Sequence, residues 1–278
     1  MKVKRILALV CAVTMAALLL SGCGPAKEKG PLITPGTLTI GCEVGYPPME
    51  YTTDDGLKFI GFDIDVGKAI SELLGLEVKV VNTTWEGIFA GLEMGQYDCI
   101  ISAVSITPER QEKYILTQPY VANALCIVTQ AGDTAVDSPE KFEGKKIAVQ
   151  SATTASESLE GMIDGGMNIK EFPYEKVMEC FGDLQNGSVD AVYVDSVVAA
   201  YYIKDNDRFT RTWISEVPEP MGICISKGNN RLAAAVEAAI DTLNYNGTIQ
   251  ALATQHFGED FTAGLRDITV EPVIPSLD

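Results

Sequence analysis

One succession of features occurs twice along the chain, and it sets the architecture that the chain can adopt. The pattern is a helix end, a glycine that terminates the helix, an aspartate, and a buried strand that stops at polar residues. It is predicted at Leu92 to Ile101 and again at Leu184 to Asp195. Each copy follows another strand, loop and helix, over residues 38–70 and 146–162. In an open α/β sheet, ligands bind where the strands end. The sequence therefore predicts two α/β lobes of similar build, each with a binding edge.

Composition agrees with two such lobes and excludes one class of partner. The 278 residues are 46% hydrophobic and 21% charged, which is a globular composition long enough for a core in each lobe. The formal net charge is −17. Because so acidic a chain repels nucleic acid and anionic lipid headgroups, we expect no nucleic-acid partner.

The stretch that follows the first buried strand has the residues of a grip for a small anion. Ser102, Ala103 and Ser105 come where the strand ends, and Pro108 opens a helical turn that carries Arg110. A guanidinium matches a carboxylate through two parallel hydrogen bonds, and serine hydroxyls fill the remaining acceptor sites. We therefore predict that this segment binds a small anion such as a carboxylate.

This segment also carries a family resemblance. Residues 102–110, Ser-Ala-Val-Ser-Ile-Thr-Pro-Glu-Arg, resemble the Ser-Gly-Met-Thr-Ile-Thr-x-x-Arg segment of family 3, the polar amino-acid solute-binding proteins of bacterial ABC importers. The order of the other motifs, from Gly36 to Gly258, is similar to that family. The resemblance implies an α/β, two-lobed periplasmic-binding-protein fold (type II, Venus-flytrap), with two crossover strands as its hinge. It also implies that Arg110 takes the ligand α-carboxylate, with Ser102, Ala103 and Ser105 beside it.

The first lobe offers a wall for the ligand side chain. Tyr46 before two prolines resembles the family's Tyr-Pro-Pro-Phe, and Trp85 at the head of a helix resembles the apolar or aromatic wall that faces it. With Glu43, these rings suit a cationic or amide-bearing side chain. Tyr46 packed beneath its own loop and Trp85 in the core are the structural alternatives. We interpret Asp63, before a helical stripe, as an N-cap.

The second lobe offers the opposite charge and another anion site. A strand over residues 146–150 precedes a helix whose first N–H groups, with the Thr154 hydroxyl, suit an anion. Ala152 stands where the family usually has glycine, which weakens the match because alanine allows less backbone freedom. Asp195 resembles the family aspartate that pairs with the ligand α-ammonium. Its structural alternative is an N-cap for the helix over residues 196–203.

The crossover strands divide the chain into its expected parts. We place them at Leu125–Val128 and Met221–Ser226. Lobe 1 then covers residues 36–123 and 220–262, and lobe 2 covers residues 124–219. Residues 263–278 form a C-terminal tail without a readable pattern.

The N-terminus predicts export and a lipid anchor. Basic residues within positions 2–5 precede the apolar run Ile6 to Leu20, and Leu20-Ser21-Gly22-Cys23 resembles the lipobox of bacterial lipoproteins. We therefore expect a signal peptide at residues 1–22, lipidation of Cys23, and a tether at residues 23–35. The alternative is an ordinary secretory signal with an incidental cysteine. The lipidated chain would lie on the extracytoplasmic face of the cell membrane.

The remaining cysteines and the single histidine predict no metal site and no cofactor. The cysteines lack CxxC or metal-ligand spacing and lie mostly in apolar strands, so we interpret them as small buried hydrophobes. They are Cys42, Cys99, Cys126, Cys180 and Cys224. A pairing of Cys126 with Cys224, on the two crossover strands, stays open. We interpret His256 as structural.

These features predict a protein that binds and delivers a ligand. Arg110 and Asp195, from different lobes, match a free amino-acid zwitterion, so binding would close the cleft, as in the periplasmic class. Arg110 is the only Lys or Arg in these motifs, which argues against an acidic ligand side chain. We expect a monomer that is not an enzyme and passes a polar, possibly cationic, amino acid to ABC importer permease subunits. Alternatives are an enzyme of the cyclohexadienyl dehydratase type and a protein that presents its ligand to a separate sensor.

Overall fold

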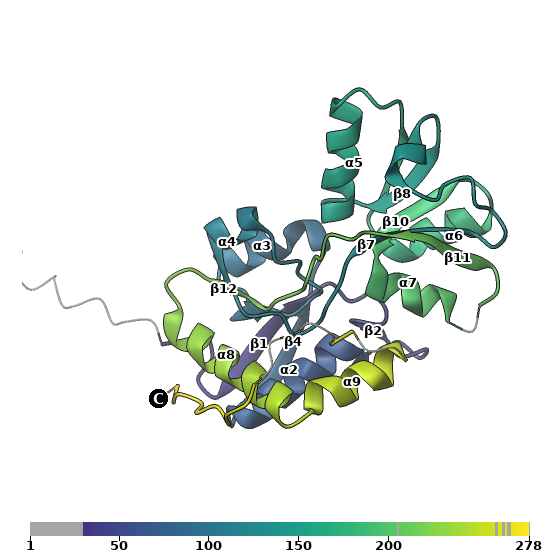
Figure 1. Ribbon diagram of the computed structural model, residues 1–278. Coiled ribbons are helices and arrows are strands. Elements are labelled where there is room, and N and C mark those ends of the chain that lie inside the picture. The colour runs from purple at the N-terminus through teal and green to yellow at the C-terminus, as the bar shows by residue number, and fades with distance from the viewer. Residues whose placement is uncertain (1–29, 205, 259–260, 263–264, 266–267, 278) are drawn as a thin grey trace, which may run out of the picture. The chain divides into compact units, whose positions relative to one another are not determined.

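The computed structural model describes residues 30–204, 206–258, 261–262, 265 and 268–277 (Figure 1). The predicted signal peptide, Cys23 and the first part of the predicted tether lie outside the described residues.

The first sheet is mixed and has the strand order β4-β1-β5-β12-β6. Its parallel strands are β1 (Thr37–Cys42), β4 (Glu77–Asn82) and β5 (Cys99–Ile100). Antiparallel pairing adds β12 (Cys224–Ser226) between β5 and β6 (Tyr114–Leu116). The helices of this lobe are α2 (Phe62–Leu73), α3 (Trp85–Glu93), α4 (Pro108–Lys113), α8 (Asn230–Tyr245) and α9 (Thr248–Phe257). In Figure 1, α2, α8 and α9 gather on one side of the sheet and α3 lies on the other. A hairpin, β2 (Tyr51–Thr52) and β3 (Phe59–Ile60), precedes α2.

The second sheet has the order β11-β7-β10-β8-β9. Its strands are β7 (Leu125–Gln130), β8 (Lys146–Gln150), β9 (Lys170–Tyr174), β10 (Ala191–Asp195) and β11 (Phe209–Ile214). The helices are α5 (Thr154–Asp164), α6 (Val177–Gln185), α7 (Ser196–Ile203) and the short 3₁₀ helix η1 (Pro139–Phe142). The chain thus has two α/β lobes, as predicted.

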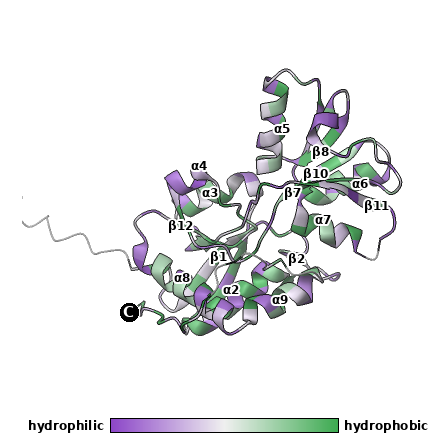
Figure 2. Cartoon of the chain, viewed as in Figure 1, coloured by the Kyte–Doolittle hydropathy of each residue, from purple (hydrophilic) through white to green (hydrophobic). Residues whose placement is uncertain are grey.

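The alternation of side chains along a strand explains why helices cover both faces of the sheets. In β10, Val192 and Val194 join the cluster that includes α6 and α7, whereas Ala191 and Tyr193 join the cluster that includes α5. Successive side chains of a strand point to opposite faces, so an all-apolar strand needs cover on both. Figure 2 shows that α2, α8 and α9 each carry both hydrophobic and hydrophilic residues.

The repeated unit is confirmed down to its turns. Gly95 and Gly187 follow α3 and α6 with left-handed φ values of +69° and +72°, which glycine adopts without strain. The aspartate three residues later then ties its strand to the neighbouring one. Asp98 accepts hydrogen bonds from the N–H groups of Ile33 (2.6 Å) and Thr39 (2.7 Å), and Asp190 accepts one from Lys146 (2.8 Å).

The predicted crossover strands each belong to one sheet. β7 pairs only within the second sheet and β12 only within the first among the described strands. The links that pass between the lobes precede them, and they pair with each other through an antiparallel bridge of Val121 with Met221. The Glu219 N–H also donates to the Asn123 carbonyl at 2.8 Å. The first predicted hinge strand, Leu125–Val128, therefore lies just past the crossing, whereas the second, Met221–Ser226, begins at the crossing with Met221 and continues into β12.

The cysteines, the histidine and the tail are structural in the described part of the chain. All five cysteines are buried free thiols, and Cys126 and Cys224 lie in different sheets. A ring nitrogen of His256 lies 2.9 Å from an Asp65 carboxylate oxygen, which joins α9 to α2. Ile274 and Leu277 pack against the core, although the sequence of the tail carried no signal for this.

None of the helices in the described residues combines the length and the apolar character that a membrane span requires.

Two helical glycines test how closely the helices are packed. A Cβ at Gly91 in α3 would lie 2.2 Å from the Tyr97 hydroxyl, whereas one at Gly182 in α6 would meet nothing within 4 Å. We expect Gly91→Ala to lower the free energy of unfolding by about 1–3 kcal/mol, because Tyr97 must move. Gly182→Ala should raise it by about 0.5–1 kcal/mol. Urea unfolding followed by circular dichroism measures both, and a fully stable Gly91→Ala chain would contradict this packing.

Candidate functional site

A pocket lies where strands of both sheets end. All nine residues that the sequence analysis placed in a ligand site line it: Glu43, Tyr46, Trp85, Ser102, Ala103, Ser105, Arg110, Thr154 and Asp195. Glu50, Gln150 and Thr153 line it as well and were missed. The carboxyl ends of β1, β5, β8 and β10 bring these segments together, as the strand-end argument requires.

Arg110 lines the pocket, and its side chain is held in place by its neighbours. The Thr107 side chain caps α4 by accepting the Arg110 backbone N–H at 3.2 Å, which fixes where the side chain starts. Nη1 donates to the Ser105 carbonyl at 3.1 Å, and the guanidinium carbon lies 5.5 Å and 5.3 Å from the ring centres of Trp85 and Phe89. Burial lowers the pKa of Arg110. Among the described residues, the Arg110 guanidinium donates to the Ser105 carbonyl. Its remaining N–H groups can therefore bind an anion.

Asp195 lies at the end of β10 and is bonded by the first lobe and by the link between the lobes. It accepts from the Tyr46 hydroxyl at 2.5 Å and from the Asn123 amide at 2.6 Å. Burial, and next the charge of Glu219, raises the pKa of Asp195 to about 7. Asp195 occupies the N-cap position of α7, but its side chain makes no capping bond. The structural alternative is therefore confirmed for the position of Asp195, but its carboxylate is used in the cleft and not for capping.

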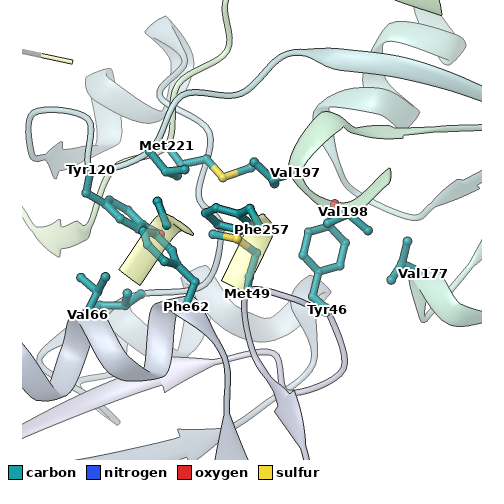
Figure 3. Close-up of a cluster of buried hydrophobic side chains, with 14 of the residues drawn as sticks. Tyr46, Met49, Phe62, Val66, Tyr120, Val177, Val197, Val198, Met221 and Phe257 are labelled. Atoms are coloured by element: carbon teal, nitrogen blue, oxygen red, sulfur yellow. The ribbon is translucent and has the colours of Figure 1, made fainter. Parts of the chain in front are cut away.

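Tyr46 and Trp85 both reach from the first lobe to the second. Figure 3 shows Tyr46 in one cluster with Val177 and Val198, so it does not pack beneath its own loop. The Trp85 indole Nε1 donates to the Ala152 carbonyl at 2.8 Å. Ala152 has a left-handed φ of +58°, a conformation that costs an alanine about 1–2 kcal/mol and that glycine adopts freely.

Thr154 faces the pocket in a different way from the prediction. Its hydroxyl donates to Glu219 Oε1 at 2.5 Å. Thr153 is the N-cap of α5 and accepts the Ser156 N–H at 3.3 Å. Because the Thr154 proton is directed to a carboxylate, the hydroxyl does not by itself complete an anion site.

A buried pair of carboxyl groups supports the segment that carries the serines, and the sequence analysis missed it. Asp63 accepts from the Ala103 N–H at 2.7 Å and from the Tyr120 hydroxyl at 2.8 Å. Glu50 accepts from the Ser102 hydroxyl at 2.6 Å. The interpretation of Asp63 as an N-cap is wrong, because Gly61 holds that position and the Asp63 side chain is used here.

Burial raises the pKa values of both carboxyl groups. Burial raises the pKa of Asp63 to about 6, and burial together with the charge of Asp63 raises the pKa of Glu50 well above its usual range. Two adjacent buried carboxylates cannot both ionise at low cost, so the fold favours the protonated form of Glu50. No periodicity marks Glu50, since it lies in a loop after two prolines.

Glu43 is paired across the cleft. Its Oε1 accepts from Lys176 Nζ at 2.5 Å and its Oε2 from the Gln150 amide at 3.2 Å. Burial raises the pKa of Glu43. Lys176 lies outside the motifs, so the argument against an acidic ligand side chain left out a cation that contacts the pocket-lining Glu43.

Comparison with known proteins agrees with this geometry. Residues 38–259 match the bacterial extracellular solute-binding proteins, family 3. The chain belongs to this family. It is 31% identical over 229 residues to the L-cystine-binding protein TcyJ of Escherichia coli (strain K12), which covers 82% of this chain and 85% of TcyJ.

Solved structures agree on the two-lobed periplasmic-binding-protein fold. An ancestral arginine-binding protein bound to arginine has a TM-score of 0.76 at 32% identity, over 80% of this chain and 99% of that one. The ancestral amino acid-binding protein AncCDT-1, a precursor of cyclohexadienyl dehydratase, has a TM-score of 0.74 at 32% identity, over 80% of this chain and 96% of that one.

The raised pKa values of Asp63 and Glu50 predict a pH dependence of stability. Folding raises the pKa of Asp63 from 3.8 to about 6 and that of Glu50 further, so the folded chain holds protons that the unfolded chain has released. The free energy of unfolding should therefore fall as pH rises through this range. Glu50→Gln should flatten that fall, because an amide does not titrate and removes the charge that Glu50 would place beside Asp63. Thermal melting between pH 4 and 7 measures the effect, with exposed Glu72→Gln as the control. Equal slopes in all three chains would contradict the pairing.

Proposed function

We propose that this chain is a lipid-anchored extracytoplasmic binding protein that captures a free L-amino acid between its lobes and delivers it to an ABC importer. The observation that carries the proposal is the placement of Arg110 and Asp195, a cation and an anion from different lobes, around one pocket. A free amino acid has the opposite charges at matching places. Both pairs form together only when the lobes are closed on the ligand.

The expected affinity supports a role in uptake. Hydrogen bonds to charged groups contribute roughly 1.5–3 kcal/mol each, so three or four of them give a binding free energy of about −8 kcal/mol, which is micromolar. The Arg110 fork, the Ser102 and Ser105 segment and Asp195 supply that number of partners. The chain is similar in sequence to a protein named for cystine and in fold to one bound to arginine, which supports a polar amino acid as ligand.

Removal of the Arg110 guanidinium tests the proposal. We expect Arg110→Ala to weaken amino-acid binding by about two to three orders of magnitude, because the bound carboxylate loses its buried partner at a cost of about 3–5 kcal/mol. Isothermal titration calorimetry with ligands chosen from a thermal-shift screen of the amino acids, cystine and ornithine measures this. Arg208→Ala, at an exposed arginine of the second lobe, is the matched control. Wild-type affinity in Arg110→Ala would refute the carboxylate site.

The lipid anchor has a separate test. We expect metabolic labelling with a radioactive or clickable palmitate analogue to mark the full chain in a bacterial host, and Cys23→Ser to abolish the label and release the protein from the membrane fraction. Cys11→Ser, within the apolar run, is the control. Labelled Cys23→Ser protein would contradict the lipobox.

An enzyme of the cyclohexadienyl dehydratase type is the second candidate. A carboxyl group with a pKa of about 7, such as Asp195, suits a general acid, and AncCDT-1 is described as a precursor of such an enzyme. Turnover of prephenate or arogenate by the purified chain would favour this candidate over binding alone. Presentation of a bound ligand to a separate sensor is compatible with the same site.

A further inference from the structure

The carboxylate of Glu43, which lines the pocket, is not free in this structure. Glu43 follows β1, is 2% exposed, and lines the pocket. Both of its oxygens accept hydrogen bonds from the second lobe, one from Lys176 at 2.5 Å and one from Gln150 at 3.2 Å. Its backbone N–H donates to the Ser102 hydroxyl at 2.9 Å, which fixes it to the segment beside Arg110.

Lys176 is held where it can make this contact. It precedes α6, and its backbone N–H donates to the Glu179 carboxylate at 3.0 Å. The lysine side chain remains 29% exposed while that of Glu43 is 3% exposed, so the ammonium enters the site from the solvent side. It passes over Gly45, where an added Cβ would lie 3.3 Å from both Lys176 Cδ and Nζ. The glycine thus leaves the space that the ion pair occupies.

The ion pair of Lys176 with Glu43 changes which ligand side chains can bind beside Glu43. An unpaired buried carboxylate would attract the side chain of arginine or lysine. A carboxylate already neutralised by Lys176 offers such a cation no net charge, and a second cation beside Lys176 is repelled. A side chain that ends in both an ammonium and a carboxylate fits the pair, since the ammonium can bond Glu43 and the carboxylate can bond Lys176.

We propose that Lys176 determines specificity at this site, selecting amino acids whose side chain ends in a second zwitterionic head and disfavouring arginine and lysine. This inference rests on the proposed function and refines its ligand class. Arg110 and Asp195 hold one amino-acid head, and Lys176 and Glu43 hold the other. Cystine is the probe of this class, and arginine is the probe of the cationic class.

Calorimetric titration of the full chain in detergent with each probe tests the proposal. The wild type should bind cystine at least tenfold more tightly than arginine, because one charge-assisted hydrogen bond contributes about 10- to 100-fold in affinity. Lys176→Met keeps the side-chain length and removes the charge. It should lower the preference for cystine by about 10- to 100-fold, as cystine loses a partner and arginine gains Glu43. Lys176→Arg should restore the wild-type preference.

Two further variants locate the effect. Lys170→Met, at an exposed lysine of the same lobe, should leave both affinities unchanged. The double variant Glu43→Gln with Lys176→Met should lose the arginine binding that Lys176→Met gains. Thermal melting without ligand confirms that each variant folds, and Lys176→Gln replaces Lys176→Met if the latter does not.

The possible results distinguish a failure of the role of Lys176 from a failure of the proposed amino-acid binding function. A wild-type preference for arginine, or a preference that Lys176→Met leaves unchanged, overturns the role of Lys176 while amino-acid binding stands. If no amino acid binds the wild type, or if Arg110→Ala binds as well as the wild type, the proposed function itself fails.

Discussion

The site depends on the cost of removing charge from water. An ion buried without a partner costs several kcal/mol, so each charged group in the closed cleft needs a partner within reach. Asp195 finds one in Tyr46 and Glu43 finds one in Lys176, and each pair joins the two lobes. Closure and the compensation of charge are therefore the same event, and the bonds between the lobes lie around the pocket that a ligand would enter.

The part of the molecule that could be predicted is the part that repeats. The helix end, glycine, aspartate and strand that occur at Gly95 and at Gly187 form the same turn in both lobes, because a left-handed C-cap and a buried strand have strong local signatures. Strand ends then place residues far apart in the sequence at one edge. Ser102 and Arg110 were found from the end of a predicted strand and Asp195 from the family resemblance, and all of them line the pocket.

The residues that could not be predicted act across lobes or beneath the site. Glu50 lies in an irregular loop, and Lys176 precedes a helix on the far side of the cleft, so no period or motif connects either residue with the pocket. Asp63 had a plausible local role as a cap, and only the tertiary contacts with Ala103 and Tyr120 reveal a different one. Local propensity says where an element starts; it does not say which buried partner a polar side chain will take.

The hydrogen bond between the Trp85 indole and the Ala152 carbonyl makes the tryptophan fluorescence of the protein sensitive to opening of the cleft. Of the two tryptophans in the chain, Trp213 packs beside Tyr193 within the second lobe, whereas Trp85 spans the gap between the lobes. Separation of the lobes would hydrate the Trp85 ring and leave the surroundings of Trp213 unchanged. The fluorescence of Trp85 thus reports the opening of the lobes in the unlabelled protein, and that of Trp213 serves as an internal reference.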